Sequence, residues 1–325
     1  MTSATWLPTA THQTLRLRAA LLARARRFFA DRQVLEVDTP AVIGSPVSDV
    51  HIDSARVIFT NAPDPTYFLH TSPEYAMKRL LAAGSGDIYQ ICHVVRGMER
   101  GRHHNAEFTL VEWYRIGFSL DDLMTEVDAL VRELLGDVAA GLASERLSYR
   151  EAFLRELQLD PFVATLAQLK EAARSLDFQN SAGADQNRDE LLELLMGAIV
   201  GPRLGQHSLT FVYGYPSTQA ALARIDPRDP RTALRFELYC KGMELANGFH
   251  ELAAAQEQRA RFEHDNAERR RVGLPAHAID ERLLAALETG LPDCAGVALG
   301  FDRTLMLAAG AHHIDEVLPF PTDRA

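Results

Sequence analysis

The sequence predicts an α+β fold in one large domain, because strand-like and helix-like segments both occur and do not alternate regularly. Segments rich in β-branched and aromatic residues predict strands, and amphipathic segments predict helices. A chain of 325 residues can bury a large core. It contains no internal repeat, low-complexity tract or Pro/Ser-rich linker. We therefore expect residues 1–325 to form one domain with a helical insertion at about 145–205. The expected strands are 34–40, 87–96, 107–115, 209–215 and 296–301, and a hairpin at 237–252.

The helices follow from apolar periodicity and from their end signals. Residues 15–31 have one apolar side, and residues 119–136 begin with Ser119 as N-cap and acids in the first turn. Residues 148–200 are predicted to be largely helical, with breaks at Pro161 and near Gly183. Further helices are expected at 253–272, at 280–287 and from about Asp302 onward.

Composition excludes several classes of protein. No apolar run approaches the length of a membrane span, and the N-terminus lacks the pattern of a signal peptide. Cys92, Cys240 and Cys294 are isolated thiols without metal-binding spacing, which favours a reducing cytoplasm and no structural zinc. The net charge of -10 argues weakly against a surface devoted to nucleic acid.

The first candidate site is a set of three carboxylates spaced seven residues apart in the sequence: Glu237, Glu244 and Glu251. On one straight strand they would alternate between faces. A two-residue turn at Lys241–Gly242 would put Glu244 on the face of Glu237. A glycine-type bulge at Asn247–Gly248 would then bring Glu251 to the same face. The alternative is that these acids lie on an ordinary solvent-exposed strand face. The apolar neighbours make this alternative less favoured: Phe236, Leu238, Leu245 and Phe249.

A strand–loop–strand unit at 88–115 is the second candidate. Arg96 ends one strand, Phe108 opens the next, and the loop 97–106 between them is dense in Arg and His. A cation and a flat ring suit a nucleotide, with the guanidinium on phosphate and the ring on the base. An exposed charged loop is at least as compatible with this segment alone. Adjacent histidines such as His103–His104 seldom point the same way, so a metal site there is disfavoured.

A strand with one nearly bare face is the third candidate. Gly296, Ala298 and Gly300 recur at period two, so a ligand could lie against the backbone. Arg303 follows at the start of a helix, where the guanidinium and the helix dipole both favour anions. Small residues on a strand often only accommodate a packed helix; Arg303 favours the binding interpretation. The sequence contains neither GxxxxGK[ST] nor GxGxxG.

Together these segments resemble the motifs of class II aminoacyl-tRNA synthetases of the lysyl subgroup. The segment ending at Pro40 is similar to motif 1, 88–115 to motif 2 and 296–309 to motif 3, and 244–252 is specific to a narrow branch. That branch is the elongation factor P–(R)-β-lysine ligases, free-standing paralogues that lack an anticodon-binding domain. The resemblance spans essentially the whole chain and extends to Thr71–Tyr75, Glu112–Tyr114 and Asp323–Ala325. It implies the class II catalytic fold, a mostly antiparallel sheet flanked by helices.

The resemblance implies an ATP-dependent ligase that adenylates (R)-β-lysine or lysine and transfers it to a lysine side chain of elongation factor P. Arg96 would bind the α-phosphate and stabilise its developing charge. Phe108 and Arg303 would sandwich the adenine, with Arg303 also reaching the γ-phosphate, and both arginines would be catalytic. Further ATP contacts are implied for His104, Asn105, Glu244, Leu245 and Gly300.

By the same resemblance, Glu237 and Glu244 would hold Mg²⁺ on the triphosphate. Glu251 with Tyr114 would bind the distal ammonium of the lysine. This pairing of opposite charges would select against amino acids with uncharged side chains. The other amino group would meet Ser72 and Glu74. The remaining lysine-binding residues implied are Asn247, Phe249 and Ala298.

Two positions depart from the family pattern. Motif 2 usually has Arg-x-Glu, whereas here Arg96 is followed by Gly97, Met98 and Glu99. Either Glu99 contacts the adenine amino group after a local shift of the backbone, or backbone groups recognise the adenine. Ala298 stands where synthetases for tRNA commonly have glycine, and its methyl group would favour the β-amino isomer.

The resemblance also implies a homodimer, built by motif 1, in the cytoplasm, with no tRNA and no membrane partner. Two alternatives are a minimal lysyl-tRNA synthetase and a non-catalytic regulatory paralogue. Such paralogues typically lose the arginines of motifs 2 and 3, but Arg96 and Arg303 are both present. An asparagine synthetase of this fold would need an aspartate pocket, for which Glu251 has the wrong charge.

Overall fold

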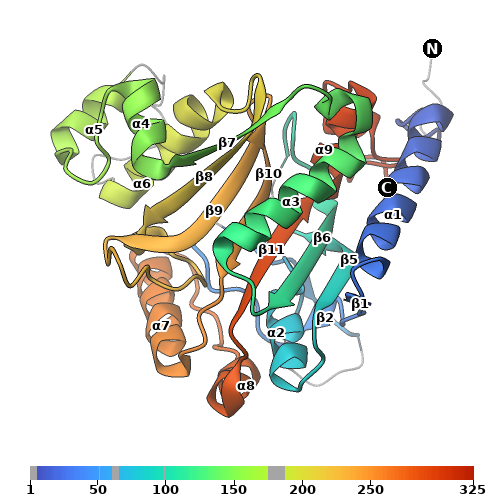
Figure 1. The fold of residues 1–325 in the computed structure, drawn as a ribbon. Helices are drawn as coiled ribbons and strands as arrows, with labels where there is room; N and C mark the ends of the chain where they lie inside the picture. Colours follow the sequence, from blue (N-terminus) through green and yellow to red (C-terminus); the bar gives the residue numbers. More distant parts are fainter. Residues whose placement is uncertain (1–5, 51, 61–65, 98–99, 175–186) are drawn as a thin grey trace. The chain divides into compact units, whose positions relative to one another are not determined.

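The computed structural model describes residues 6–50, 52–60, 66–97, 100–174 and 187–325 (Figure 1). Backbone contacts divide the chain into two compact units, which are described one at a time. Unit 1 comprises Met1–Ser119, Ala129–Ala140 and Leu252–Ala325, and unit 2 comprises Leu120–Asp128 and Gly141–Glu251. The predicted insertion at 145–205 belongs to unit 2. Among the described residues, no helix is both long and apolar enough to cross a membrane.

Unit 1 is built on four strands in the order β1-β5-β6-β11. β1 (Leu35–Glu36) pairs parallel with β5 (Ile88–Val95), whereas β5 with β6 (Glu107–Ile116) and β6 with β11 (Cys294–Gly300) pair antiparallel. A separate small sheet has the order β2 (Val42–Ile43), β4 (Tyr67–Leu69), β3 (Arg56–Val57). The predicted strands at 87–96, 107–115 and 296–301 are confirmed, and the 34–40 strand shortens to two residues.

The helices of unit 1 include α1 (His12–Ala30), which begins at Thr11, whose side chain accepts a hydrogen bond from the Thr14 amide. The others are α2 (Glu74–Ala82), α7 (Ala255–Arg271), α8 (Glu281–Gly290), α9 (Phe301–Ala309) and the 3₁₀ turns η1 (Gly136–Ala139) and η5 (Ile314–Glu316). α2 and α8 lie side by side, and their apolar faces join Ile88 and Tyr114 of the sheet in one core (Figure 1). This core supports the strands that carry the second and third candidate segments.

The described residues of unit 2 form four strands in the order β10-β9-β8-β7. β7 (Ala143–Ser148) pairs parallel with β8 (Ser208–Pro216), and β8, β9 (Thr232–Cys240) and β10 (Met243–His250) are antiparallel neighbours. Helices α4 (Tyr149–Leu157), α5 (Leu166–Ala173) and α6 (Arg188–Leu195) pack on this sheet through a shared apolar core. The chain continues through the π-helix η2 (Met196–Val200) and the 3₁₀ turns η3 (Gly201–Arg203) and η4 (Ser217–Gln219). β7 was not expected from the sequence, and Gly183 lies outside the described residues.

Helix α3 (Leu120–Leu135) confirms the helix predicted after Ser119, and its residues divide between the two units. Its acidic first turn holds Asp121, which pairs with Arg146 of β7, both in unit 2.

The β9–β10 hairpin confirms the predicted turn and corrects the predicted bulge. Lys241 and Gly242 have φ of 50° and 73°, as a two-residue turn of the primed type requires. Met243 pairs with Cys240 and Glu244 with Tyr239, as predicted. The bulge, however, lies at Leu245, between Glu244 and Ala246, and the expected bulge at Asn247–Gly248 is wrong. Leu245 is the extra residue because its apolar side chain can be buried there; it is 2% exposed.

Candidate active site

The cation and ring at the ends of β5 and β6 lie together as the sequence predicted. The guanidinium of Arg96 lies over the Phe108 ring, 5.1 Å from its centroid, and its Nε donates to the Thr71 carbonyl at 3.3 Å. The Arg96 amide donates to the Ala106 carbonyl at 2.9 Å, which fixes the base of the loop. A cation–π contact of this kind attracts the guanidinium to the face of the ring. Met98 and Glu99 lie outside the described residues, so the way in which adenine is read stays a prediction.

Arg303 and His104 form a second pair in unit 1. Arg303 is the third residue of α9, and its Nη2 lies 2.6 Å from His104 Nε2. Burial, and then the Arg303 charge, lower the pKa of His104 to about 4. The ring is therefore neutral near pH 7, and because arginine can only donate, Nε2 accepts and Nδ1 carries the proton. A neutral ring adds no second positive charge beside the Arg303 guanidinium.

Asn105, expected to contact the nucleotide, is 2% exposed and its side chain is already hydrogen-bonded. Its Oδ1 accepts from Arg100 Nη1 at 2.8 Å and from the Thr322 amide and hydroxyl at 3.2 Å each, and its Nδ2 donates to the Glu107 carbonyl at 2.7 Å. A direct contact with nucleotide stays a prediction.

A buried carboxylate that sequence reasoning missed, Glu112, lies among the unit 1 residues predicted to bind lysine. It is 2% exposed and accepts from Ser72 Oγ at 2.8 Å and from the Tyr114 hydroxyl at 2.7 Å. Glu74 begins α2, its amide donating to Ser72 Oγ at 3.0 Å, and its carboxylate pairs at 2.6 Å with Lys78, which is 1% exposed. The placement of Ser72, Glu74 and Tyr114 around one carboxylate is new information from the structure.

The charges of this pocket favour one additional cation. Burial, and then the Glu74 charge, raise the pKa of Glu112 well above its ordinary value, to about 7. With both carboxylates ionised, Lys78 balances only one of them. An ammonium ion bound here would add a positive charge beside the two carboxylates, and it would favour the ionised form of Glu112.

The sheet register places the bare face of β11 beside Glu112. Ala298 pairs with Glu112, which pairs with Gln90 on β5, and Gly296 and Gly300 pair with Tyr114 and Leu110. Directly paired residues point to the same face, so the Ala298 methyl group stands next to the Glu112 side chain. Gln90 is 1% exposed, and neither atom of its amide has an oxygen or nitrogen partner among the described residues.

In unit 2, one face of the β9–β10 hairpin carries the predicted acidic residues. The register puts these side chains on it: Arg235, Glu237, Tyr239, Glu244, Asn247 and Phe249. Glu251 follows Phe249 by two residues and bridges to Ala223, so the alternation carries it to the same face. The single bulge at Leu245 therefore achieves what the predicted bulge was expected to do. Glu251 is 1% exposed, and Asn247 Oδ1 is buried without a hydrogen-bond partner among the described residues.

Glu237 accepts hydrogen bonds at both oxygens of its carboxylate. Its Oε1 accepts from Arg235 Nη2 at 2.6 Å, and its Oε2 accepts from the hydroxyls of Tyr215 and Tyr239 at 2.6 Å each. A carboxylate offers about four acceptor positions, so one remains for a metal ion. Mg²⁺ commonly takes one or two protein carboxylates and completes its shell with phosphate and water. Glu237 and Glu244 fit that pattern, and no group of three metal-binding side chains occurs in the described part of the chain.

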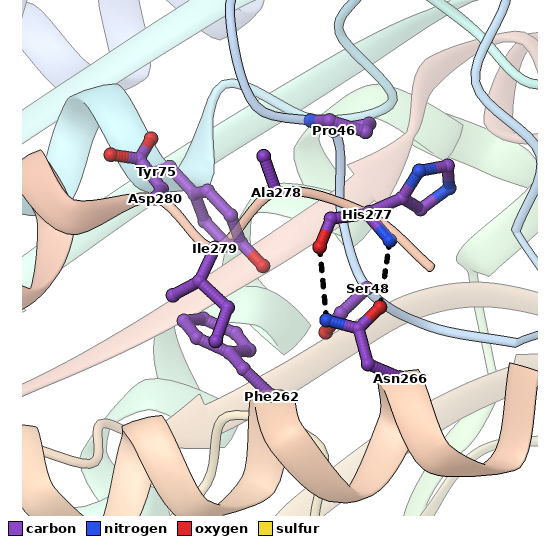
Figure 2. Close-up of a pocket in the computed structure, with 9 residues that line it drawn as sticks. All are labelled: Pro46, Ser48, Tyr75, Phe262, Asn266, His277, Ala278, Ile279 and Asp280. Carbon is purple, nitrogen blue, oxygen red and sulfur yellow. Dashed lines mark hydrogen bonds between the residues drawn. The ribbon is translucent and has the colours of Figure 1, made fainter. Parts of the chain in front are cut away.

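A separate pocket in unit 1 does not contain the predicted residues. It lies between Tyr75, Phe262 and the segment 277–280, where the Asn266 amide exchanges two hydrogen bonds with the His277 backbone (Figure 2). The lining side chains leave almost no enclosed space between them, whereas most small-molecule sites have ~300–1,000 Å³. We interpret this pocket as a small gap in the packing beside α2, and not as a ligand site.

Comparison with known proteins identifies the family. The family model for class II tRNA synthetases (D, K and N) matches residues 5–324. The chain belongs to the class II tRNA synthetase family. The class II fold predicted from the sequence is thereby confirmed, and the segments that resemble motifs 2 and 3 form β5–β6 and β11–α9.

Similar class II proteins cover the chain from end to end. An elongation factor P–(R)-β-lysine ligase of Klebsiella pneumoniae is 51% identical over 99% of both chains. Proteins of the same name from Vibrio cholerae and Salmonella typhi are each 50% identical, over 100% and 99% of both chains. Identity at this level over whole chains shows that this class II protein is an enzyme of the ligase type.

Proposed function

We propose that the protein is an ATP-dependent, AMP-forming ligase that activates (R)-β-lysine, or lysine, and transfers it to a lysine side chain of elongation factor P. The observation that carries the proposal is the 50–51% identity, over whole chains, to ligases of that name. In the first step a carboxylate oxygen of the amino acid attacks the α-phosphorus of ATP and pyrophosphate leaves. In the second, the acceptor amine attacks the acyl carbon and AMP leaves. Alignment and charge neutralisation suffice for the first step, because the attacking carboxylate is already ionised.

Arg96 and Arg303 are the cations we assign to ATP. Arg96, held by the Phe108 ring and the Thr71 carbonyl, would bind the α-phosphate, where negative charge develops. Arg303 and Phe108 would contact the adenine, and neutral His104 would orient Arg303. Asn105 and Gly300 would support the nucleotide, as would Leu245 through its backbone, since its side chain is buried.

The lysine substrate carries two ammonium groups, and we assign carboxylates to both of them. In unit 1, Glu74 and Glu112 with Ser72 and Tyr114 would bind the amino group nearer the carboxylate, with Ala298 shaping the pocket. In unit 2, Glu251 would bind the distal ammonium, and Asn247 Oδ1 could accept from a substrate amine. Phe249 would pack on the aliphatic chain. Tyr114 was assigned to the distal ammonium from the sequence, but its hydrogen bond to Glu112 supports a role at the nearer one.

Mg²⁺ is the metal we assign to the triphosphate, with Glu244 and one remaining position of Glu237 as its protein ligands. When bound, the ion would neutralise phosphate charge. The segment that resembles motif 1 would build a homodimer, and its residue Leu35 is exposed in the single chain. Elongation factor P as acceptor implies work in the cytoplasm, without tRNA.

The test is transfer of labelled (R)-β-lysine and α-lysine to elongation factor P and to lysine tRNA, side by side. We expect ATP-dependent label on the protein and none on tRNA. Label on tRNA alone would identify a minimal lysyl-tRNA synthetase instead. Absence of amino-acid-stimulated ATP–pyrophosphate exchange would identify a non-catalytic paralogue.

The raised pKa of Glu112 predicts how substrate binding depends on pH. The carboxyl is protonated below about pH 7, and only its ionised form attracts an ammonium group. KM for the amino acid should therefore rise as pH falls from 8 to 6, approaching about tenfold per pH unit well below the pKa. The Glu112→Gln variant should bind more weakly and lose this dependence. KM values for wild type and variant across this pH range check the prediction, and parallel profiles would contradict it.

The methyl group of Ala298 is predicted to set the preference between lysine isomers. Ala298→Gly removes one methyl group beside Glu112, so the ratio of kcat/KM for (R)-β-lysine over α-lysine should fall about tenfold, the usual scale for one methylene. Ala295→Gly makes the same change on the opposite face of β11 and is the matched control. An unchanged ratio in Ala298→Gly would exclude this role.

A further inference from the structure

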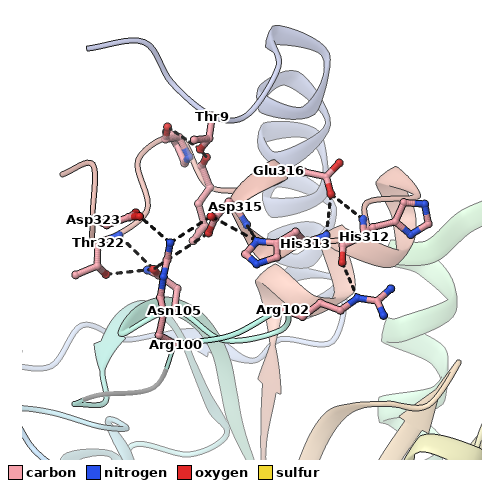
Figure 3. A network of polar contacts seen from close by, with 12 residues as sticks. Thr9, Arg100, Arg102, Asn105, His312, His313, Asp315, Glu316, Thr322 and Asp323 are labelled. Atoms are coloured by element: carbon pink, nitrogen blue, oxygen red, sulfur yellow. Dashed lines mark hydrogen bonds and ion pairs between the residues drawn. The ribbon is translucent and has the colours of Figure 1, made fainter. Parts of the chain in front are cut away.

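The end of the chain lies against the loop that carries His104, although more than two hundred residues separate them in sequence (Figure 3). Two hydrogen bonds join the segments: the Ile314 amide donates to the Arg102 carbonyl at 2.9 Å, and the side-chain Nε of Arg102 donates to the His312 carbonyl at 2.8 Å. We call residues 100–106 the loop and residues 312–323 the tail. Both belong to unit 1.

Asn105 is the buried centre of this contact. Its side chain joins the loop, the start of β6 and the tail, through Arg100, the Glu107 carbonyl and Thr322. Because Asn105 is 2% exposed, losing one of these partners would leave a buried polar group unsatisfied. The position of the loop is therefore coupled to the position of the tail.

Arg100 adds a charged connection. Its guanidinium lies between two tail carboxylates, with Nη2 at 3.2 Å from Asp315 Oδ2 and at 3.0 Å from Asp323 Oδ1. A planar guanidinium bonded to two acids and to Asn105 is restricted more strongly than one in a single exposed pair.

Hydrogen bonds outside the loop hold the tail in place. Thr9 Oγ1 donates to the Leu318 carbonyl at 2.7 Å, and the Thr9 amide donates to the Pro319 carbonyl at 3.0 Å. Glu316 accepts from the amides of His312 and His313 at 2.9 and 2.7 Å, which closes the turn after α9 (Figure 3).

We propose that the tail positions the loop for ATP, and that Arg100 and Asn105 are positioning residues acting through His104 and Arg303. α9 carries Arg303 and leads directly into the tail, and the tail holds the loop from which His104 meets Arg303. The positions of both His104 and Arg303 therefore depend on the tail. A loop held in place before ATP arrives loses less conformational entropy on binding. The inference rests on the proposed function only in taking ATP as the ligand.

The test compares Arg100→Ala and Thr322→Val with wild type. Thr322→Val removes only the hydroxyl donor to Asn105, in a residue of the tail. We expect the Kd for ATP, measured by calorimetry without amino acid, to rise about tenfold in Arg100→Ala, the scale of one charge-assisted hydrogen bond, and less in Thr322→Val. KM for the amino acid and kcat at saturating ATP should stay within about twofold, because only nucleotide binding is affected. Hydrogen exchange of the amides in the loop should become faster in both variants.

Arg259→Ala is the matched control. The Arg259–Glu281 pair of unit 1 has side-chain exposures of 40% and 65%, against 40% and 64% for Arg100–Asp323. We expect it to leave the Kd for ATP and loop exchange unchanged. Equal Kd values in Arg100→Ala and Arg259→Ala, or unchanged loop exchange, would overturn the role of the tail, as would a wild type that binds no ATP. A wild type that binds ATP without modifying elongation factor P would refute only the proposed function.

Discussion

Replacing Arg96 with alanine is expected to lower kcat/KM for amino-acid adenylation by about 10²–10³-fold, the usual cost of one group aimed at developing charge. Arg96 is already oriented in the structure, by the Phe108 ring at 5.1 Å and the Thr71 carbonyl at 3.3 Å. Its loss leaves the charge on the α-phosphate without that partner. Lysine-stimulated ATP–pyrophosphate exchange measures the effect.

Arg96→Lys separates charge from geometry. Lysine keeps the positive charge but loses the planar fork and the stacking on Phe108. We expect it to recover only part of the activity, with thermal unfolding like that of wild type in both variants. Exchange within about threefold of wild type in Arg96→Ala would remove Arg96 from the catalytic residues.

Replacing Arg235 with alanine is expected to destabilise the protein by about 3–5 kcal/mol, because it leaves a buried carboxylate without its cation. The side chains of Arg235 and Glu237 are 17% and 9% exposed and lie 2.6 Å apart. The hydroxyls of Tyr215 and Tyr239 still donate to Glu237, which favours the lower end of that range. Urea unfolding followed by circular dichroism measures the change.

Arg231→Ala is the control for this prediction. Arg231 also pairs with an acid, Asp229, and lies over an aromatic ring, but its side chain is 67% exposed. Water screens and replaces such a surface pair, so its loss should barely move the unfolding midpoint. If Arg235→Ala and Arg231→Ala unfold at the same urea concentration, the buried network does not stabilise unit 2.

Local chemistry explains why much of the fold could be predicted. The Lys241–Gly242 turn, the strands at 88–95 and 107–116 and the helix beginning at Phe301 depend on turn residues, β-branched runs and end signals that lie within a few residues. Period-two spacing likewise predicted that Gly296, Ala298 and Gly300 share one strand face, which the pairing of β11 with β6 supports.

Long-range pairing explains what could not be predicted. Strand β7 is held by parallel pairing with β8, sixty-five residues further along the chain, and no local pattern marks it. The bulge at Leu245 depends on which apolar residue the core can bury, so the local Asn–Gly signal misplaced it. Glu112 is one acid in a strand, and only burial beside Ser72, Glu74 and Tyr114 makes it a candidate binding group.

The sequence by itself determined the family, the class II fold and the residue types of the candidate site, because motif residues and turn chemistry are local properties. The tertiary structure decided which partners those residues have. Glu237 proves to be bound by Arg235 and two tyrosines, Asn105 joins the loop to the tail, and Glu112 has a raised pKa. Burial and hydrogen bonding between distant segments set these properties, and they exist only once the chain has folded.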